Sequence, residues 1–315
     1  MIRPLTTVAI ASALVLGLAG PGLAKGGGGE AEAQAALPVV LTAELSGVEL
    51  FGDAVVSGRL DPPHPGMTVE VRFLREGKVQ EKRTVPMAED GSFRATFDVV
   101  RWGKFQGEAH WAGDTDHDPA MATTNAQSVA RPRPLRQGSK GRWVLILERR
   151  LDELGYYGPK PNKRFDQRTG DQVMAFHKVH GMPRSKAVSK RTWKRLTKPK
   201  TPKPKQKKPK VHIEVDQSKQ VLYVVRNGAV DEILHTSTGA GGATRDGTFR
   251  VHRKIAGYSP GRLYYPSYFD GNRAVHGWPD VPPNNASHGC SRVPMWSAVH
   301  MHRIMKYGMV VRVYH

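Results

Sequence analysis

A tract rich in lysine and proline, about two thirds of the way along the chain, constrains the fold more than any other feature. It reads KPKTPKPKQKKPK and spans residues 198–210. Proline lacks the backbone N–H that helices and sheets require, and closely spaced lysines repel one another, so this composition cannot build a hydrophobic core. We therefore expect an extended, semi-rigid, cationic spacer that separates two folded parts of the chain.

The residues after this tract, 211–315, have the length of one domain and read mostly as β-strands. Strand-like runs are VHIEVD, QVLYVVRNG and GTFRVHR, and Asn227-Gly228 is typical of a hairpin turn. The run AVHMHRIMKYG predicts one short helix that ends at Gly308, before a last strand. This part of the chain is predicted to be a mostly β domain.

Residues 138–197 show the spacing of helices instead. Apolar residues recur three or four positions apart, and glycines at Gly155 and Gly181 end the first two runs. The apolar positions are Val144, Leu147, Leu151 and Leu154, then Val173 and Phe176, then Trp193 and Leu196. The pattern predicts a domain of three helices with no catalytic group of its own.

Residues 38–130 favour an antiparallel β-sandwich, which we assign to the immunoglobulin-like class although its Cys-Trp-Cys pattern is missing. In SFRATFDV, at 92–99, apolar and polar side chains alternate as they do in a strand with one buried face. The acidic loop DTDHD, at 114–118, is best interpreted as a solvated loop, with cation binding as the less favoured alternative.

The chain begins with the features of a secretory signal. Residues 1–24 contain a basic start at Arg3, an apolar run and a small-residue pattern that ends at Ala24, where we expect cleavage. A retained anchor is the alternative, but the apolar run is shorter than the ~20 residues of a spanning helix. Residues 25–37 predict a flexible spacer. We expect a secreted protein of the cell wall or periplasmic space, without a stable transmembrane segment.

The net charge is +20, from 48 Lys and Arg against 28 Asp and Glu, and it favours polyanionic partners. For a secreted chain, anionic cell-wall polymers or lipid head groups fit this charge better than nucleic acid does. Nucleic-acid binding also predicts aromatic residues among the basic ones, and the tract at 198–210 has none. We therefore expect no nucleic-acid partner.

The sequence contains a single cysteine, Cys290, in the run ASHGCSR. A thiol becomes a good nucleophile when a histidine stands beside it, and His276 and His288 are both close in sequence. Gly289 allows a sharp turn that aims backbone N–H groups at an oxyanion, and Arg292 is able to hold a carboxylate. Thiol-dependent acyl transfer is the favoured interpretation.

Two other interpretations of Cys290 remain open at this stage. Zinc binding would use His276, His288 and Cys290, with His300 or His302, but the usual closely spaced ligand pairs are missing. An inert, buried thiol is the second alternative. Aromatic residues around the site line a cleft or pack in the core, and the sequence does not decide which; they are Tyr258, Tyr264, Tyr265, Tyr268 and Trp278.

The pattern of His276-Gly277 followed by SHGCSR at 287–292 resembles the signature of the L,D-transpeptidases, the YkuD-type catalytic domain. The run STGAGGATRDGTFRVHRK, at 237–254, is also similar to that family, and the resemblance covers 211–315. The runs LERRLDELGYY, RFDQRTGDQVMAFHKVHGM and TWKRL of the helical part resemble a small peptidoglycan-binding repeat.

The resemblance implies a β-rich catalytic domain in which Cys290 is the nucleophile and His276 its base, oriented by the carbonyl group of Gly277. It implies supporting roles for His288, Arg292 and Ser287, and an oxyanion hole formed by the backbone N–H groups of Gly289 and Cys290. No metal and no organic cofactor is implied.

The implied reaction joins peptidoglycan stem peptides through a thioester on Cys290, with release of D-alanine and formation of a 3→3 cross-link. The implied partners are these stem peptides and the glycan. Water as acceptor would make the protein an L,D-carboxypeptidase. A wall-binding protein with an idle catalytic domain is the other alternative, but such a protein is expected to have lost Cys290 or His276.

Overall fold

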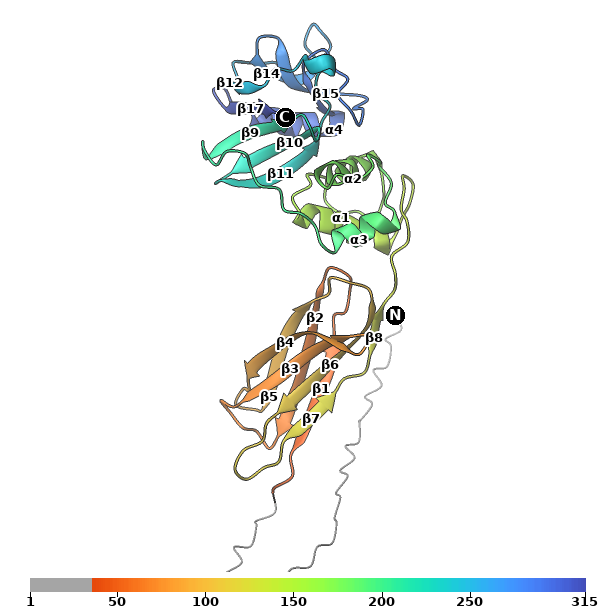
Figure 1. Cartoon of the computed structure of the whole chain (residues 1–315), viewed down its shortest axis with the longest axis vertical. Coiled ribbons are helices and arrows are strands. Elements are labelled where there is room, and N and C mark those ends of the chain that lie inside the picture. Colours follow the sequence, from red (N-terminus) through yellow and green to blue (C-terminus); the bar gives the residue numbers. More distant parts are fainter. Residues whose placement is uncertain (1–35) are drawn as a thin grey trace, which may run out of the picture.

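The computed structural model describes residues 36–315, which form three successive units along the chain (Figure 1). The expected signal at 1–24 lies outside the described residues, as does nearly all of the spacer at 25–37. No helix within the described residues is both long and apolar enough to cross a membrane. The protein is therefore multidomain, as predicted, and its secretion stays a prediction.

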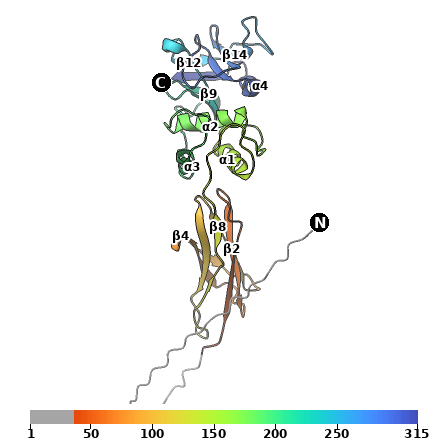
Figure 2. The same ribbon diagram turned by 90° about the vertical axis from the view of Figure 1, so that its right-hand side faces the viewer.

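The first unit is a β domain made of two antiparallel sheets. Its strands are β1 (Val40–Ser46), β2 (Asp53–Asp61), β3 (Thr68–Arg75), β4 (Lys78–Pro86), β5 (Ser92–Asp98), β6 (Gly103–Trp111), β7 (Ala120–Thr123) and β8 (Gln127–Val129). One sheet has the order β1-β2-β5 and the other β4-β3-β6-β7, with β8 also paired to β6. Figure 2 shows the two sheets as separate layers.

Aromatic side chains fill the space between these sheets. The ring of Phe73 in β3 stacks on Phe97 of β5 and on Phe105 of β6, with centroids 5.1 and 5.2 Å apart. In β5, Phe93, Ala95 and Phe97 are buried, while the polar residues between them are not, which confirms the predicted alternation. The assignment to the immunoglobulin-like class stays a prediction.

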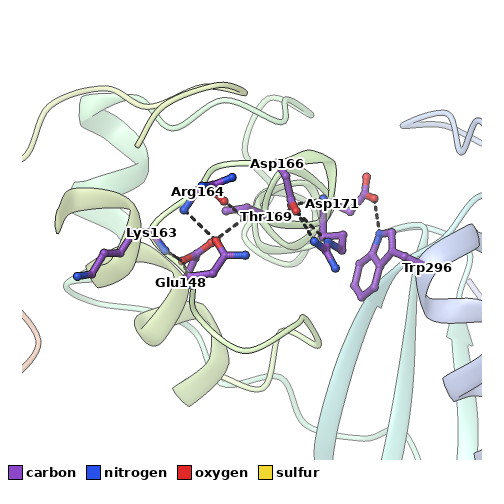
Figure 3. A network of polar contacts seen from close by, with 9 residues as sticks. Glu148, Lys163, Arg164, Asp166, Thr169, Asp171 and Trp296 are labelled. Atoms are coloured by element: carbon purple, nitrogen blue, oxygen red, sulfur yellow. Dashed lines mark hydrogen bonds and ion pairs between the residues drawn. The ribbon is translucent and has the colours of Figure 1, made fainter. Parts of the chain in front are cut away.

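The second unit contains helices α1 (Arg142–Glu153), α2 (Gln167–Val179) and α3 (Lys190–Leu196). The predicted apolar positions are buried in it, except for a half-buried Leu154. The buried carboxylate of Glu148 ties the helices to the loop before α2, because it accepts the N–H groups of Asn162 and Lys163 and the hydroxyl of Thr169, at 2.9 to 3.0 Å (Figure 3). Asp166 caps α2 through the N–H groups of Arg168 and Thr169.

The third unit is mostly β, as predicted. Its elements are β9 (Val211–Asp216), β10 (Val221–Arg226), β11 (Ala229–His235), the short helix η1 (Ala240–Gly242), β12 (Gly247–Arg250), β13 (Arg253–Lys254), β14 (Tyr264–Asp270), β15 (Arg273–Trp278), β16 (Ser291–Pro294), α4 (Met295–Ile304) and β17 (Val310–Tyr314). One sheet has the order β11-β10-β9-β17-β12 and the other β13-β14-β15-β16. The two sheets and α4 enclose one hydrophobic core. This arrangement fixes β15 and β16, which carry the candidate site.

The lysine and proline tract contains no helix or strand, as predicted, but it is anchored at several points. The N–H groups of Lys205 and Gln206 donate to the buried carboxylate of Glu214, each at 2.8 Å, and the N–H of Lys200 donates to His180 Nε2. The tract therefore runs along the surface of its neighbours.

The helical unit packs directly against the third unit, so the tract separates them in sequence and does not hold them apart in space. Lys178 of α2 inserts its ammonium group into the contact, where Nζ lies 2.7 Å from His235 Nδ1 and donates to the carbonyl oxygens of Gln220 and Thr236. Burial lowers the pKa of Lys178 to about 6. Trp296 of α4 donates Nε1–H to Asp171 of α2 at 2.9 Å (Figure 3).

Candidate active site

Two neighbouring strands bring the segment of Cys290 close to His276. β15 and β16 pair in parallel, with His276 opposite Arg292 and Val275 opposite Ser291. Cys290 directly precedes β16, in a bend, and its Sγ lies 3.8 Å from the carbonyl oxygen of Asn272, the residue before β15. The pairing of the two strands thus brings residues fourteen positions apart to one end of the sheet.

The imidazole of His276 is oriented by a backbone carbonyl. Its Nδ1 lies 2.9 Å from the oxygen of Gly277, and because a carbonyl oxygen only accepts, Nδ1 carries the proton. Nε2 is then a free lone pair. The residue is only 2% exposed, and burial lowers the pKa of His276 to about 4, so the ring is neutral near pH 7. The hydrogen bond to Gly277 that the resemblance implied is present.

Gly277 also has a steric reason to be glycine. A Cβ atom at this position would lie 2.7 Å from Cβ of Ala298 in α4 and 3.0 Å from the ring of Tyr264. Both distances are shorter than a van der Waals contact, so a larger residue would push β15 away from α4. The carbonyl that orients His276 therefore depends on close helix–sheet packing.

The thiol of Cys290 is partly buried beside the start of β16. Burial raises the pKa of this thiol, while the backbone N–H of Ala274 and the charges of Arg292 and Arg273 act in the opposite direction and weaken the rise. Sγ lies 3.8 Å from the carbonyl oxygen of Asn272. A neutral thiol and a neutral imidazole are the groups that general-base activation requires, in which the proton leaves as the sulfur attacks.

Ser287 holds the loop that leads into the thiol. Its hydroxyl donates to the carbonyl oxygen of Cys290 at 2.5 Å and accepts the N–H of Gly289 at 3.1 Å. The Gly289 N–H is therefore engaged within the loop in this structure. The oxyanion hole predicted at the N–H groups of Gly289 and Cys290 stays a prediction. Gly289 has a φ of 128°, and a Cβ there would lie 3.0 Å from Ala243 O, so glycine is required.

His288 and Arg292, the other two residues with predicted supporting roles, lie in different surroundings. His288 is exposed, and its side chain makes no hydrogen bond within residues 36–315. Arg292 lies with Cζ 4.9 Å from the centroid of the Trp278 ring and donates to the oxygen of Ala286 at 3.3 Å. A positive charge is thus held on the strand that pairs with that of His276.

Residues outside the predicted set also support the site. Asp270 forms ion pairs with Arg245 and with Arg273, and the Nε–H of Arg273 donates to Ala243 O at 2.8 Å. The hydroxyl of Thr244 donates to the oxygen of Gly289 at 2.9 Å. Among these supporting residues, only Asp270 lies in a short sequence pattern that predicts local structure: Asp270-Gly271 is typical of a hairpin turn. The loop at 239–245 reaches Gly289 through tertiary contacts that no local pattern predicts.

Two histidines that the zinc interpretation considered have other partners. His300 pairs with Glu232 at 2.6 Å, and His302 Nδ1 lies 3.2 Å from Tyr265 O. Within residues 36–315, His, Cys and carboxylate atoms gather at metal-binding distances in another place, at His64, Asp114 and His117.

The tyrosines near the site differ in their burial. Tyr268 is buried, with Arg253 Cζ 3.9 Å from its ring centroid, whereas Tyr258 is 63% exposed. Tyr258 contacts Tyr264 with ring centroids 4.8 Å apart, and Tyr264 contacts Tyr265 at the same distance. Tyr268 is therefore a core residue, and the other three tyrosines form a partly exposed cluster on the hairpin that includes β14.

Fold and site together define a β-rich domain with a cysteine–histidine pair. The family model described as "L,D-transpeptidase catalytic domain" matches residues 210–313, and the one described as "Putative peptidoglycan binding domain" matches 141–196. The L,D-transpeptidase of Xylanimonas cellulosilytica is 31% identical, with a TM-score of 0.54, over 59% of this chain and 100% of that one. The chain therefore belongs to the L,D-transpeptidase family.

Two further solved structures are similar over part of the chain. The L,D-transpeptidase of Stackebrandtia nassauensis is 24% identical over 59% of this chain and 98% of its own, with a TM-score of 0.36. One from Mycobacterium tuberculosis is 21% identical over 34% of this chain and 58% of its own, with a TM-score of 0.31. Comparison with curated proteins found no match.

Proposed function

We propose that this protein is a secreted cysteine acyltransferase that forms 3→3 cross-links between peptidoglycan stem peptides. The observation that supports this most directly is the pairing of β15, which carries His276, with β16, which Cys290 directly precedes, together with the hydrogen bond from His276 Nδ1 to Gly277 O. A neutral, oriented imidazole thus lies on the strand beside the segment that carries the only thiol of the chain. Membership of the L,D-transpeptidase family supports the stem peptide as the substrate.

In the first half-reaction, Sγ of Cys290 attacks the carbonyl carbon of the third stem residue and passes its proton to Nε2 of His276. The imidazolium then protonates the amine of the terminal D-alanine, and the C–N bond breaks. D-Alanine leaves, and a thioester remains on Cys290. The low pKa of His276, about 4, makes its protonated form a strong acid for this step.

In the second half-reaction, the side-chain amine of a neighbouring stem attacks the thioester carbon. His276 takes the proton that this amine loses and returns it to the departing sulfur. The product is a 3→3 amide bond, and the free thiol is restored. Water in place of the amine gives the carboxypeptidase product, so the two acceptors are distinguished by the product alone.

The rest of the molecule supports action at the wall. The helical unit matches a peptidoglycan-binding family, and it is fixed to the catalytic unit through Lys178 and Asp171. The tract at 198–210 keeps most of its lysines exposed. Anionic wall polymers are the partners we propose for this charge, and a position outside the cytoplasm follows from the expected signal at 1–24.

Intact-mass spectrometry of the purified chain with a carbapenem tests the nucleophile. We expect one covalent adduct that maps to Cys290, is blocked by prior alkylation, is insensitive to EDTA and is missing in Cys290→Ala. Circular dichroism checks that the variant is folded. An adduct in Cys290→Ala, or one that EDTA abolishes, would contradict the assignment. Incubation of the wild type with stem tetrapeptides then shows whether cross-linked dimer or tripeptide forms.

A further inference from the structure

The far end of the β domain brings two histidines and a carboxylate together. His64 follows β2, and Asp114 and His117 follow β6, so two loops from different sheets meet. His64 Nε2 lies 3.3 Å from His117 Nδ1 and 3.2 Å from Asp114 Oδ2, and His117 Nδ1 lies 2.8 Å from Asp114 Oδ1. We name these three residues the His64 cluster.

The atoms of the His64 cluster that face one another are acceptors, and the hydrogen bonds do not give each of them a proton. One further proton or cation is needed to satisfy them. His64 Nδ1 lies 2.8 Å from the carbonyl oxygen of Pro62, so Nδ1 carries the proton and a neutral ring has a bare Nε2. That lone pair faces an oxygen of Asp114, which also only accepts. His117 Nδ1 lies 2.8 Å from the other Asp114 oxygen, and it also presents a lone pair when the ring carries its proton on Nε2. The lone pairs of His64 Nε2 and Asp114 Oδ2 then face each other across 3.2 Å.

A metal cation would satisfy these converging lone pairs. Bonds of ~2.0–2.1 Å at tetrahedral angles separate ligand atoms by about 3.3 Å, close to the 3.2 and 3.3 Å that separate His64 Nε2 from its two neighbours. The bond from His64 Nδ1 to Pro62 is the outer contact that fixes the ring of a metal-binding histidine. Two imidazole nitrogens and one carboxylate favour zinc over calcium or magnesium.

The surroundings of the His64 cluster are those of a prepared site. The side chains of His64, His117 and Asp114 are 12, 13 and 23% exposed, so a fourth position stays open to solvent. The ring of His64 packs against the buried Trp111, with centroids 4.8 Å apart. The N–H of Asp116 donates to Asp114 Oδ1, and this bond and that of His117 hold the pKa of Asp114 below its usual value.

We propose that the His64 cluster is a zinc site with a water molecule as its fourth ligand, and that it clamps the two sheets together. Leu37 pairs with His117 and donates its N–H to Asp116 O at 2.8 Å, so the segment that enters the domain is held at the same place. The starts of β2 and β6 lie toward the helical unit, since Phe51 stacks on Trp193 (Figure 1). The clamp therefore closes the opposite end.

Calorimetric titration of the untagged full-length chain with Zn²⁺ tests the site. We expect one zinc per chain and an unfolding temperature of the β domain that rises by about 5 °C or more at saturation. His64→Ala, and separately the isosteric Asp114→Asn, should each weaken zinc binding at least ~10-fold. His110→Ala is the matched control, because His110 pairs with one carboxylate, Glu108, on β6. Co²⁺ should give the visible absorption of a tetrahedral site in the wild type and in His110→Ala.

Three outcomes would overturn this proposal. The first is a wild-type chain that takes up no zinc at micromolar concentrations. The second is zinc binding that survives both His64→Ala and Asp114→Asn. The third is zinc binding that Cys290→Ala removes, because the metal would then sit at the catalytic thiol. Asp114→Asn changes no side-chain volume, so it remains informative if His64→Ala fails to fold.

Discussion

His276 in the catalytic unit and His64 in the β domain are oriented by the same hydrogen bond, from Nδ1–H to a backbone carbonyl oxygen. The distances are 2.9 Å to Gly277 and 2.8 Å to Pro62. Each ring is left with Nε2 as a lone pair. His276 lies on the strand beside the segment that carries the Cys290 thiol, whereas His64 faces the carboxylate of Asp114 and a second imidazole.

The difference shows that the partner of Nε2 decides what such a ring does. A proton donor in front of the lone pair makes the histidine a base, and a ring of other lone pairs makes it a ligand for a cation. Burial strengthens the first role, because it lowers the pKa of His276 to about 4 and keeps the ring neutral. Partial exposure suits the second role, because a metal ion must enter from solvent.

The largest effect is expected from removing the catalytic ring. His276→Ala should slow acylation of Cys290 by a carbapenem about 10²- to 10⁴-fold, since no general base remains. His288→Ala should change the rate less than about 10-fold, because this side chain is exposed and makes no hydrogen bond within the described residues. Stopped-flow measurement of both variants checks the ranking. Equal losses in the two would show that His288 shares the role of base.

The pH dependence of acylation tests the state of the His276 ring. Its folded pKa of about 4 lies below the ordinary 6.5, so the rate should fall only as the pH drops toward about 4. The unfolded chain binds this proton more readily, so the stability from the neutral ring is present above pH 6.5 and lost as the pH falls to about 4. An acidic limb near 6.5 in the rate profile would mean that burial does not shift this group.

The smallest effect is expected for the lysines of the tract at 198–210, because we expect them to bind anionic polymers through charge and not through a fixed contact. Lys203, Lys207 and Lys208 of the tract are exposed. Binding of the chain to an anionic wall polymer should weaken several-fold between about 0.1 M and about 1 M salt, as the Debye length falls from about 10 Å to about 3 Å. Replacement of these lysines by glutamine should flatten that dependence in a sedimentation assay. Zinc binding at the His64 cluster, a coordinated site, should change little over the same range.

Much of this molecule follows from local pattern. The alternation of Phe93, Ala95 and Phe97 predicts a strand with one buried face, and the spacing of Val144, Leu147 and Leu151 predicts α1. Such patterns work because backbone geometry sets the period of side chains along a strand or helix. The run SHGCSR likewise indicates the reactive thiol, because a turn at glycine and a nearby histidine are short-range features.

The sequence alone therefore determined the order of the domains and the lack of a core in the lysine and proline tract, and it predicted the pairing of Cys290 with His276. Only the tertiary structure decided that Lys178 joins two units on either side of the tract, that Ser287 occupies the N–H of Gly289, and that His64 meets a loop fifty residues later. These contacts depend on sheet register and on how domains pack, so no periodicity within the chain encodes them.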